Sequence, residues 1–244
     1  MAGSVLITGA TRGLGEALAR QFASRGYSLA ITGRSGEELE KLQAELGRQA
    51  PKVCSRVLDV TDFDAVPKVL RECAAELDGL DIVVVNAGVA FAVKAGTGGF
   101  EQIRTTIDVN LNGAIATSEA AIELFREQGH GHLVGITSVA ALRGFAKQGA
   151  YSASKAGFGK YLESAGIDTW NEAITVTELA PGYIDTDLNR GLESRPFLVS
   201  AEKGTRIMAD LIEKRVSFRY VPPWPWTLVA QAMKILPAGV LRRM

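Results

Sequence analysis

A tyrosine and a lysine four residues apart are the side chains of this sequence best suited to acid–base chemistry. Tyr151 and Lys155 lie in YSASKAGF, residues 151–158, and on a helix this spacing places both on one face about one turn apart. An unperturbed tyrosine titrates near pH ~10, but a fixed ammonium group nearby favours its phenolate. We therefore expect Tyr151 to act as a general acid or base with Lys155 beneath it.

Two polar residues precede this pair at the ends of predicted elements. Ser138 ends a predicted strand thirteen residues before Tyr151, and Asn110 starts a predicted helix over 110–127. Taken singly, Ser138 is explained as a strand-end cap and Asn110 as a helix cap, and Tyr-x-x-x-Lys arises by chance in many helices. Their joint occurrence indicates a catalytic site built from Asn110, Ser138, Tyr151 and Lys155.

A glycine-rich turn follows the first apolar run of the chain. In TGATRGLG, residues 8–15, Gly9 lies just past that run, and Gly13 and Gly15 fall where a helix must begin. Glycine permits positive φ and lets backbone N–H groups approach a pyrophosphate, which a helix N-terminus further stabilises. The turn predicts nucleotide binding, although its glycines do not follow the G-x-G-x-x-G spacing.

Short apolar runs alternate along the chain with longer helical patterns. This alternation is typical of βαβ units and a parallel sheet, and no repeat or linker divides it. We predict a single-domain α/β fold over residues 1–244: a Rossmann-type, doubly wound parallel β-sheet with helices on both faces. The predicted strands are 4–8, 27–32, 52–60, 81–86, 132–138 and 173–179, and the predicted helices are 14–24, 37–48, 62–77, 110–127 and 152–170. Beyond Pro181 we expect a substrate loop over 182–199, a helix near 201–215, a short strand and a C-terminal apolar extension over 221–244.

Composition narrows the classes of function. Lys plus Arg and Asp plus Glu both total 27, and no basic tract suits a phosphate backbone, so we expect no nucleic-acid partner. Cys54 and Cys73 show neither metal spacing nor a secreted framework. We therefore expect no metal and two free thiols in a reducing cytoplasm. A strand begins within three residues of the start and no apolar run reaches the ~20 residues of a spanning helix, which also predicts a cytoplasmic protein.

The glycine turn resembles the T-G-x-x-x-G-x-G fingerprint of the short-chain dehydrogenase/reductase family. Further segments resemble that family: LDVTD at 58–62, NAG at 86–88, PGYIDTD at 181–187, and the interval from Ser138 to the Tyr-x-x-x-Lys pair. The resemblance covers residues 4–187. It implies an oxidoreductase that interconverts a carbonyl group and an alcohol by hydride transfer with a nicotinamide cofactor.

The resemblance also implies a role for each catalytic candidate. Tyr151 would give a proton to a carbonyl oxygen or take one from an alcohol. Lys155 would lower the pKa of that tyrosine and bind the nicotinamide ribose. Ser138 would orient the substrate oxygen, and Asn110 would hold a water that links Lys155 to solvent.

Two arginines decide the expected cofactor. The second predicted strand ends in ITGRS, with Arg34 and no acid before Glu37. A guanidinium can pair with a 2′-phosphate, which an aspartate would repel, and Arg12 in the glycine turn adds a second cation. Either arginine alone is explained as a solvated loop residue; together they favour NADP(H) over NAD(H).

The remaining cofactor contacts follow from the resemblance. Asp59 and the backbone of Val60 would hold the adenine, and Asn86 would lie along the ribose. The alternative is that Asp59 and Asn86 are ordinary turn residues at the ends of strands. The full expected set is Gly9, Thr11, Arg12, Gly13, Leu14, Gly15, Arg34, Asp59, Val60, Asn86, Ala87, Gly88, Tyr151, Lys155, Pro181, Gly182, Ile184 and Thr186.

Substrate contacts are expected from three segments, 89–99, 139–149 and 183–199. They carry Val89, Phe91, Val93, Ala140, Leu142, Phe145, Tyr183, Leu188 and Leu192, with Arg143 and Lys147 among them. This composition predicts a small, hydrophobic ketone, aldehyde or secondary alcohol as substrate. The resemblance implies a homodimer or homotetramer formed through the helices predicted at 110–127 and 152–170.

The C-terminal extension has one polar stripe. Thr227, Gln231 and Lys234 share a narrow face of a predicted helix whose other faces are apolar. We favour packing on its own domain or on a sister subunit. The alternative is peripheral membrane contact anchored by Trp224, Trp226 and the Arg242–Arg243 end.

Two rival functions stay open at this point. A redox sensor that holds NADP(H) without turnover could keep the glycine turn and Arg34, but it would need neither Tyr151 nor Lys155. Epimerase or dehydratase chemistry on the same fold usually involves longer chains and substrate-specific elements that this sequence does not show.

Overall fold

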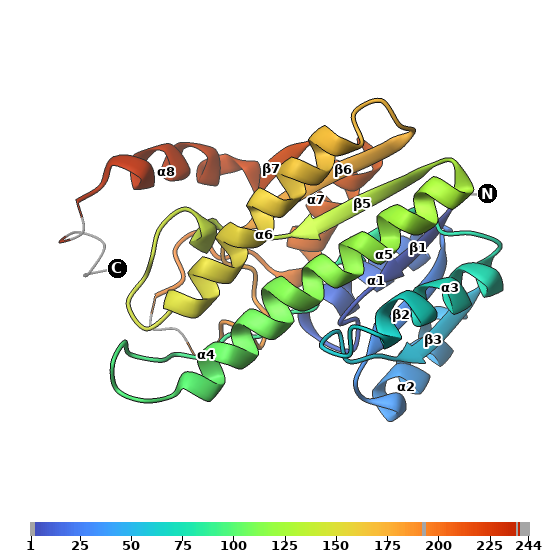
Figure 1. The fold of residues 1–244 in the computed structure, drawn as a ribbon, viewed down its shortest axis with the longest axis horizontal. Coiled ribbons are helices and arrows are strands. Elements are labelled where there is room, and N and C mark those ends of the chain that lie inside the picture. The colour runs from blue at the N-terminus through green and yellow to red at the C-terminus, as the bar shows by residue number, and fades with distance from the viewer. Residues whose placement is uncertain (1–2, 192–193, 238, 240–244) are drawn as a thin grey trace.

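A parallel sheet organises the chain. The computed structural model describes residues 3–191, 194–237 and 239, and within them the sheet has seven strands in the order β3-β2-β1-β4-β5-β6-β7 (Figure 1). The strands are β1 (Ser4–Ile7), β2 (Ser28–Gly33), β3 (Val53–Val57), β4 (Ile82–Val85), β5 (Gly131–Ile136), β6 (Ile174–Pro181) and β7 (Phe218–Val221). Every pairing is parallel. The predicted doubly wound α/β fold is confirmed.

Helices cover both faces of this sheet. They are α1 (Gly13–Ser24), α2 (Gly36–Leu46), α3 (Ala65–Leu77), α4 (Phe100–Ile107), α5 (Gly113–Gln128), α6 (Gly149–Asp168), α7 (Ala201–Glu213) and α8 (Pro223–Ile235). On one face of β1, Leu6 packs with residues of α3, α5 and α6. On the other face, Val5 and Ile7 pack with residues of α1, α2 and α7. Because both faces are covered, the central strands are apolar throughout rather than alternating.

The helix predicted to start at Asn110 starts earlier. The helical path begins with α4 at Phe100, continues through a π-helical turn over Asp108–Asn112, and joins α5 at Gly113. The prediction was wrong because α4 is only eight residues long and buries only Thr106, and the π-helical turn that follows it interrupts the regular helical period. Asn110 therefore lies inside a π-turn, a feature often found at functional sites, and does not cap a helix.

The strand predicted over 52–60 is shorter than expected. β3 ends at Val57, and the following residues turn away from the sheet. Asp59 Oδ1 accepts hydrogen bonds from Thr61 N at 3.0 Å and Thr61 Oγ1 at 2.7 Å. This side-chain turn competes with ladder pairing, so the chain leaves the strand before α3.

The C-terminal helix α8 packs on its own chain, as we favoured. Its inner face, formed by Trp226, Ala230 and Met233, is buried against a separate apolar cluster beside β6 and β7. Leu228 and Ile235 stay exposed, and Figure 1 shows α8 past β7, at the end of the molecule away from the N-terminus. Arg242, Arg243 and Leu192 lie outside the described residues. Among the helices that the structure describes, none has the length and apolar character needed to cross a bilayer.

Candidate functional site

The predicted site residues gather at the carboxyl ends of the central strands. The glycine turn follows β1, Asn86 follows β4, Ser138 lies two residues beyond β5, and Gly182 follows β6. The strand order reverses between β1 and β4. Ligands of open α/β sheets bind in the crevice outside such a reversal, so the topology alone places a ligand site here.

The glycine turn needs glycine for two physical reasons. Gly9 and Gly13 have φ of 66° and 62°, in the left-handed region that other residues adopt at a cost. At Gly15 the backbone angle is ordinary, but a Cβ would clash with the Gly9 carbonyl oxygen and lie 2.6 Å from Asn86 Nδ2. The turn therefore keeps its backbone bare where a phosphate would approach.

Asn86 holds the glycine turn in place. Its Nδ2 donates to the carbonyl oxygens of Thr8 at 2.9 Å and Gly9 at 3.2 Å. The Thr8 hydroxyl in turn accepts from the backbone N–H groups of Asn86 at 3.0 Å and Ala87 at 3.2 Å. Sequence reasoning did not single out Thr8, although its place as the last residue before Gly9 could have pointed to it.

Arg12 and Arg34 are exposed beside the glycine turn. The turn lies against the end of β2, since Ala10 N donates to Thr32 O at 2.8 Å and a Cβ on Gly33 would meet Thr11 Cγ2 at 2.7 Å. Within the described part of the chain, neither guanidinium pairs with a carboxylate. Two uncommitted cations next to a bare backbone turn suit an anion such as a dinucleotide phosphate.

Asp59 and Val60 lie on the loop after β3. Burial raises the pKa of Asp59, but the two hydrogen bonds from Thr61 and the charge of Arg34 outweigh it and hold that pKa below its usual range. Val60 is buried, and its side chain lies 2.8 Å from where a Cβ on Gly113 would be. Val60 is thus packed against the start of α5.

Tyr151 and Ser138 lie together at the end of β5. Burial raises the pKa of Tyr151, the Ser138 hydroxyl lowers it as a hydrogen-bond partner, and nearby Tyr183 raises it again. Burial dominates, so the net pKa of Tyr151 lies above its ordinary value. Ser138 Oγ also accepts from Ala140 N at 3.1 Å, so the side chain caps the turn after β5 as well as facing the tyrosine.

Lys155 is a buried cation one turn beyond Tyr151. Its Nζ donates to the carbonyl oxygen of Ile136 at 2.8 Å. Burial lowers the pKa of Lys155 to about 8. A Cβ on Gly88 would lie 3.7 Å from this Nζ and 3.3 Å from Asn110 Oδ1, so a larger residue there would crowd the asparagine oxygen.

Asn110 uses its side chain within the protein. Oδ1 accepts from Val89 N and Nδ2 donates to Val89 O, both at 2.8 Å. Nδ2 also lies 3.3 Å from Ser154 Oγ, and that hydroxyl donates to the main-chain oxygen of Tyr151 at 2.8 Å. Asn110 thus joins the turn after β4 to the helix that carries the tyrosine. Sequence reasoning missed Val89 and Ser154 as its partners, because these contacts depend on the fold.

The segment after β6 crosses the opposite side of the site. Gly182 N donates to Val221 O at 2.9 Å. Ile184 is 1% exposed, and its main-chain oxygen accepts from Asn189 Nδ2 at 2.7 Å. Thr186 Cβ is 3.6 Å from where a Cβ on Gly13 would lie. The structure thus brings the last predicted cofactor segment against the first.

The expected substrate segments divide into two groups. Leu142, Phe145 and Tyr183 pack against α8. Arg143, expected to face substrate, instead donates from Nη1 to the main-chain oxygens of Met233 at 2.9 Å and Leu236 at 3.0 Å. Arg143 binds there because the last turn of a helix has unpaired carbonyl groups that a cation satisfies.

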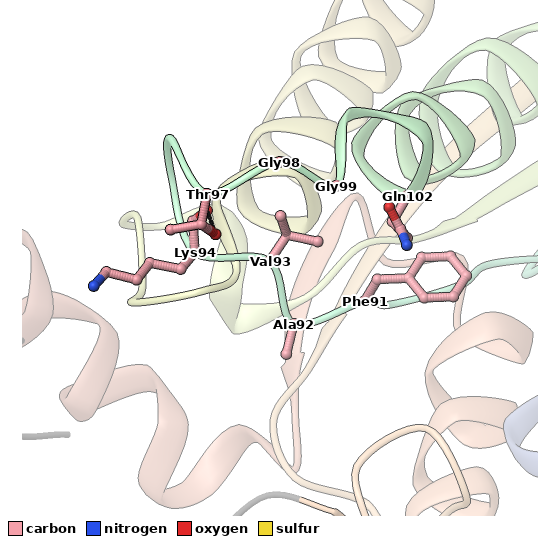
Figure 2. Close-up of a pocket in the computed structure, with 8 residues that line it drawn as sticks. All are labelled: Phe91, Ala92, Val93, Lys94, Thr97, Gly98, Gly99 and Gln102. Carbon is pink, nitrogen blue, oxygen red and sulfur yellow. Dashed lines mark hydrogen bonds between the residues drawn. The ribbon is translucent and has the colours of Figure 1, made fainter.

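The second group borders a shallow pocket of about 330 Å³. Figure 2 shows Phe91 and Gln102 at one side of it and the Lys94 side chain extending away from the other lining residues. The segment that lines the pocket is fixed to the segment before α6, since Val93 N donates to Lys147 O at 2.8 Å. The lining residues are Phe91, Ala92, Val93, Lys94, Thr97, Gly98, Gly99 and Gln102, none of which is a catalytic candidate.

Comparison with known proteins decides the family. Residues 4–196 match the family model described as short chain dehydrogenase. The chain belongs to the short-chain dehydrogenase family. This short-chain dehydrogenase is accordingly an oxidoreductase and an enzyme, and the family uses nicotinamide cofactors.

Curated relatives match different lengths of this short-chain dehydrogenase. An uncharacterized oxidoreductase of Mycobacterium tuberculosis is 38% identical over 242 residues, 98% of this chain and 96% of the relative. An NADP-dependent 3-hydroxy acid dehydrogenase of Escherichia coli is 34% identical over 181 residues, 74% of this chain and 72% of the relative.

Solved structures share the fold. An alcohol dehydrogenase from the archaeon Thermococcus sibiricus, complexed with 5-hydroxy-NADP, has a TM-score of 0.81 at 27% identity and covers 90% of this chain and 95% of its own. Levodione reductase has a TM-score of 0.78 at 26% identity, covering 86% of this chain and 90% of its own.

Proposed function

We propose that this short-chain dehydrogenase interconverts a carbonyl compound and an alcohol with NADP(H), using Tyr151 as the general acid or base. The observation that carries the proposal is the placement of Ser138 beside the Tyr151 hydroxyl, with the buried Lys155 one turn further along α6. A phenol, a hydroxyl and a buried cation converging at the carboxyl edge of the sheet suit proton exchange with a substrate oxygen.

Two exposed arginines support NADP(H) as the cofactor. Arg12 and Arg34 would pair with the 2′-phosphate, and the bare turn from Gly9 to Gly15 would take the pyrophosphate. Asp59, Val60 and residues 86–88 would hold the adenosine, and Lys155, Gly182, Ile184 and Thr186 the nicotinamide end. The E. coli relative is named NADP-dependent, and the T. sibiricus enzyme is complexed with an NADP derivative. When bound, the nicotinamide would supply or accept the hydride.

The pKa directions support proton donation by Tyr151 during reduction. Because the pKa of Tyr151 is raised, its phenol is protonated at neutral pH and can give a proton to a carbonyl oxygen. Lys155, with a pKa of about 8, is then largely charged and stabilises the phenolate that remains. The side chain of Asn110 is engaged with Val89, so the water expected to reprotonate this pair would bind the main chain of Asn110.

A small hydrophobic carbonyl compound or alcohol is the proposed substrate. Tyr183, Leu142 and Phe145 lie in the segments that border the catalytic residues, and they are apolar or aromatic. We propose that residues 182–199 form the substrate loop of a single domain over 1–244, with 221–244 as its apolar extension. The named activity of the E. coli relative makes 3-hydroxy acids worth including among the compounds tested.

Assembly and location are proposals of the same kind. We propose a homodimer or homotetramer formed through α5 and α6, working in the cytoplasm, where the buried free thiols Cys54 and Cys73 stay reduced. Peripheral membrane contact is the lesser proposal. It would depend on Trp224 and Leu228, which are exposed, whereas Trp226 is buried and so unavailable as an anchor. Liposome flotation of the full chain against a Leu228→Ser/Ile235→Ser variant would test it, and equal flotation would end the idea.

A substrate panel tests the proposed function. Ketones, aldehydes, secondary alcohols and 3-hydroxy acids are assayed with NADPH or NADP⁺ and with NADH or NAD⁺. We expect turnover with NADP(H) that Tyr151→Phe abolishes while cofactor binding is retained. Absence of turnover across the panel, with tight NADPH binding, would favour the non-catalytic redox sensor instead.

A further inference from the structure

The indole N–H of Trp226 is a buried donor that no acceptor in the described part of the chain reaches. Trp226 is 3% exposed, and its Nε1 has no hydrogen-bond partner among the described residues. Buried tryptophan N–H groups usually find a partner, and the indole can only donate. Trp226 therefore lacks an acceptor that some ligand could supply.

The position of this donor relates it to the catalytic centre. The edge of the indole that carries Nε1 lies directly over Gly182, so closely that a Cβ there would clash with Nε1. The next residue, Tyr183, packs on the indole with ring centroids 5.9 Å apart. Tyr183 also lies close enough to Tyr151 to influence it electrostatically. Tyr183 is thus a neighbour of both the indole and Tyr151.

The helix that carries Trp226 is fixed at its far end. Arg143 lies just after the turn capped by Ser138 and donates to the main-chain oxygens of Met233 and Leu236 at the end of α8. Ala230, in the middle of the helix, is fully buried. The helix is therefore held by hydrogen bonds at its C-terminal end and by packing at its middle, which suits a helix that positions a ligand group.

The expected substrate loop covers the outer side of Trp226. Phe197 packs nearly perpendicular to the indole, with ring centroids 5.8 Å apart. Its side chain is 51% exposed, and its backbone takes φ of 58°, a left-handed conformation that is strained for phenylalanine. A strained, half-exposed ring on a loop is suited to moving aside.

We propose that Trp226 is a specificity-determining residue of the substrate site, and that its N–H binds a second oxygen of the substrate when Phe197 moves aside. The inference rests on the proposed carbonyl–alcohol chemistry. It assigns the substrate to carbonyl compounds, and the matching alcohols, that carry a further acceptor oxygen such as an ester or carboxylate. A simple ketone would leave the indole donor unpaired, which disfavours it relative to the oxygenated compound.

Turnover of matched substrates tests this assignment. Ethyl pyruvate, ethyl acetoacetate and ethyl levulinate are compared with methyl ketones of equal chain length in wild type and in Trp226→Phe, which keeps an aromatic ring but removes the N–H. We expect kcat/KM to fall at least about tenfold for the best keto ester and to change by less than about threefold for its matched ketone. Trp224→Phe, on the exposed side of the same helix, should change neither. Equal losses for ester and ketone, or no loss for either, would overturn the proposal.

A binding measurement keeps the test independent of turnover. The sequence has three tryptophans, so ¹⁵N-labelled full-length protein gives three indole N–H signals, assigned with Trp170→Phe and Trp224→Phe even where Trp226→Phe does not fold. The Trp226 proton signal should move downfield when a keto ester is added to the protein saturated with NADP⁺. No movement, the same movement with the matched ketone, or the full movement with NADP⁺ alone would overturn the role of Trp226. If wild type turns over no carbonyl compound, the proposed function fails, whereas this titration still decides whether Trp226 binds an acceptor.

Discussion

The ammonium group of Lys155 donates a hydrogen bond to the carbonyl oxygen of Ile136, at 2.8 Å, inside the protein. The contact fixes the lysine against the end of β5, two residues before Ser138. It also keeps the charge away from water, and this burial lowers the pKa of Lys155 to about 8. The charge of the site is therefore sensitive to mildly alkaline pH.

Carbonyl reduction should decline above about pH 8. Lys155 loses its charge as pH rises through its pKa of about 8, whereas the raised pKa of Tyr151 keeps the phenol protonated. The neutral lysine no longer stabilises the phenolate that forms on proton transfer. Profiles of kcat/KM for reduction between pH 6 and 10 should be flat at first and then fall with an apparent pKa near 8. A profile that stays level to pH 10 would contradict this assignment.

Replacement of Lys155 by methionine should stabilise the protein while it abolishes turnover. The folded state holds the charged lysine at a cost, since its pKa lies below the ordinary 10.5, so the free energy of unfolding rises as pH passes from 8 towards 10.5. Lys155→Met removes this cost, and we expect a gain of about 1 to 3 kcal/mol at pH 7 in urea unfolding. Lys160→Met, on the exposed side of the same helix, is the control and should change stability by less than about 0.5 kcal/mol.

Arg34→Asp should weaken the binding of NADPH far more than that of NADH. The substitution removes a cation beside the expected 2′-phosphate and adds a repelling carboxylate. We expect a loss of about 10- to 100-fold for NADPH, as for a charge-assisted contact, and less than about threefold for NADH, measured by fluorescence titration. Arg48→Asp, an exposed residue beyond the end of α2, is the matched control. Equal losses for both cofactors would sink the NADP(H) assignment.

Asn110→Leu should destabilise the fold as well as the site. The substitution leaves the N–H and carbonyl groups of Val89 without their partners, and unpaired buried polar groups cost about 1–3 kcal/mol each. We expect a loss of about 2 to 4 kcal/mol in urea unfolding. Asn112→Leu, two residues later and exposed, removes only a bond to Asp108 and should lose less than about 1 kcal/mol. Similar losses for the two variants would show that the contact with Val89 is unimportant.

Mild acid should destabilise the protein through His132. Its Nε2 lies 2.8 Å from Thr177 Oγ1, and burial together with Arg215 lowers its pKa to about 3. The unfolded state therefore binds a proton below about pH 6.5 that the folded state does not bind, so the free energy of unfolding decreases as the pH is lowered. Between pH 7.5 and 5 the loss should be about 2 kcal/mol. His130→Gln, which removes the only other histidine of the sequence at an exposed site, should keep this loss, and His132→Gln should lose it.

The sheet and the turns at its edge were predictable because their signals are local. Gly9 and Gly13 need left-handed backbone, and β-branched apolar runs mark buried strands, so neighbours in sequence carry the information. The alternation of strands and helices predicted a parallel sheet, whereas the order of its strands came from the structure. The spacing of Tyr151 and Lys155 placed both on one helix face without knowledge of the fold.

The predictions that failed concerned features that depend mainly on contacts between residues distant in the sequence. The Arg143 guanidinium binds carbonyl groups about ninety residues further along the chain, and nothing near Arg143 indicates that. The pKa of Tyr151 lies above its ordinary value because burial, which comes from tertiary packing, outweighs its neighbours. α4 went unnoticed because it is only eight residues long and leads into a π-helical turn that interrupts the helical period.

The hydrogen bonds from Arg143 to the end of α8 tie the C-terminal helix to the segment that follows Ser138. Deleting such a tail is the routine way to ask what it does. Here the deletion would expose the apolar cluster around Val139 and Tyr220. It would also leave the Arg143 guanidinium, five residues from Ser138, without its acceptors, and it would remove the indole that covers Gly182. A shortened chain would therefore report damage to catalysis even if the tail had a separate task elsewhere. Single substitutions on the outer face of α8 are the way to tell the two apart.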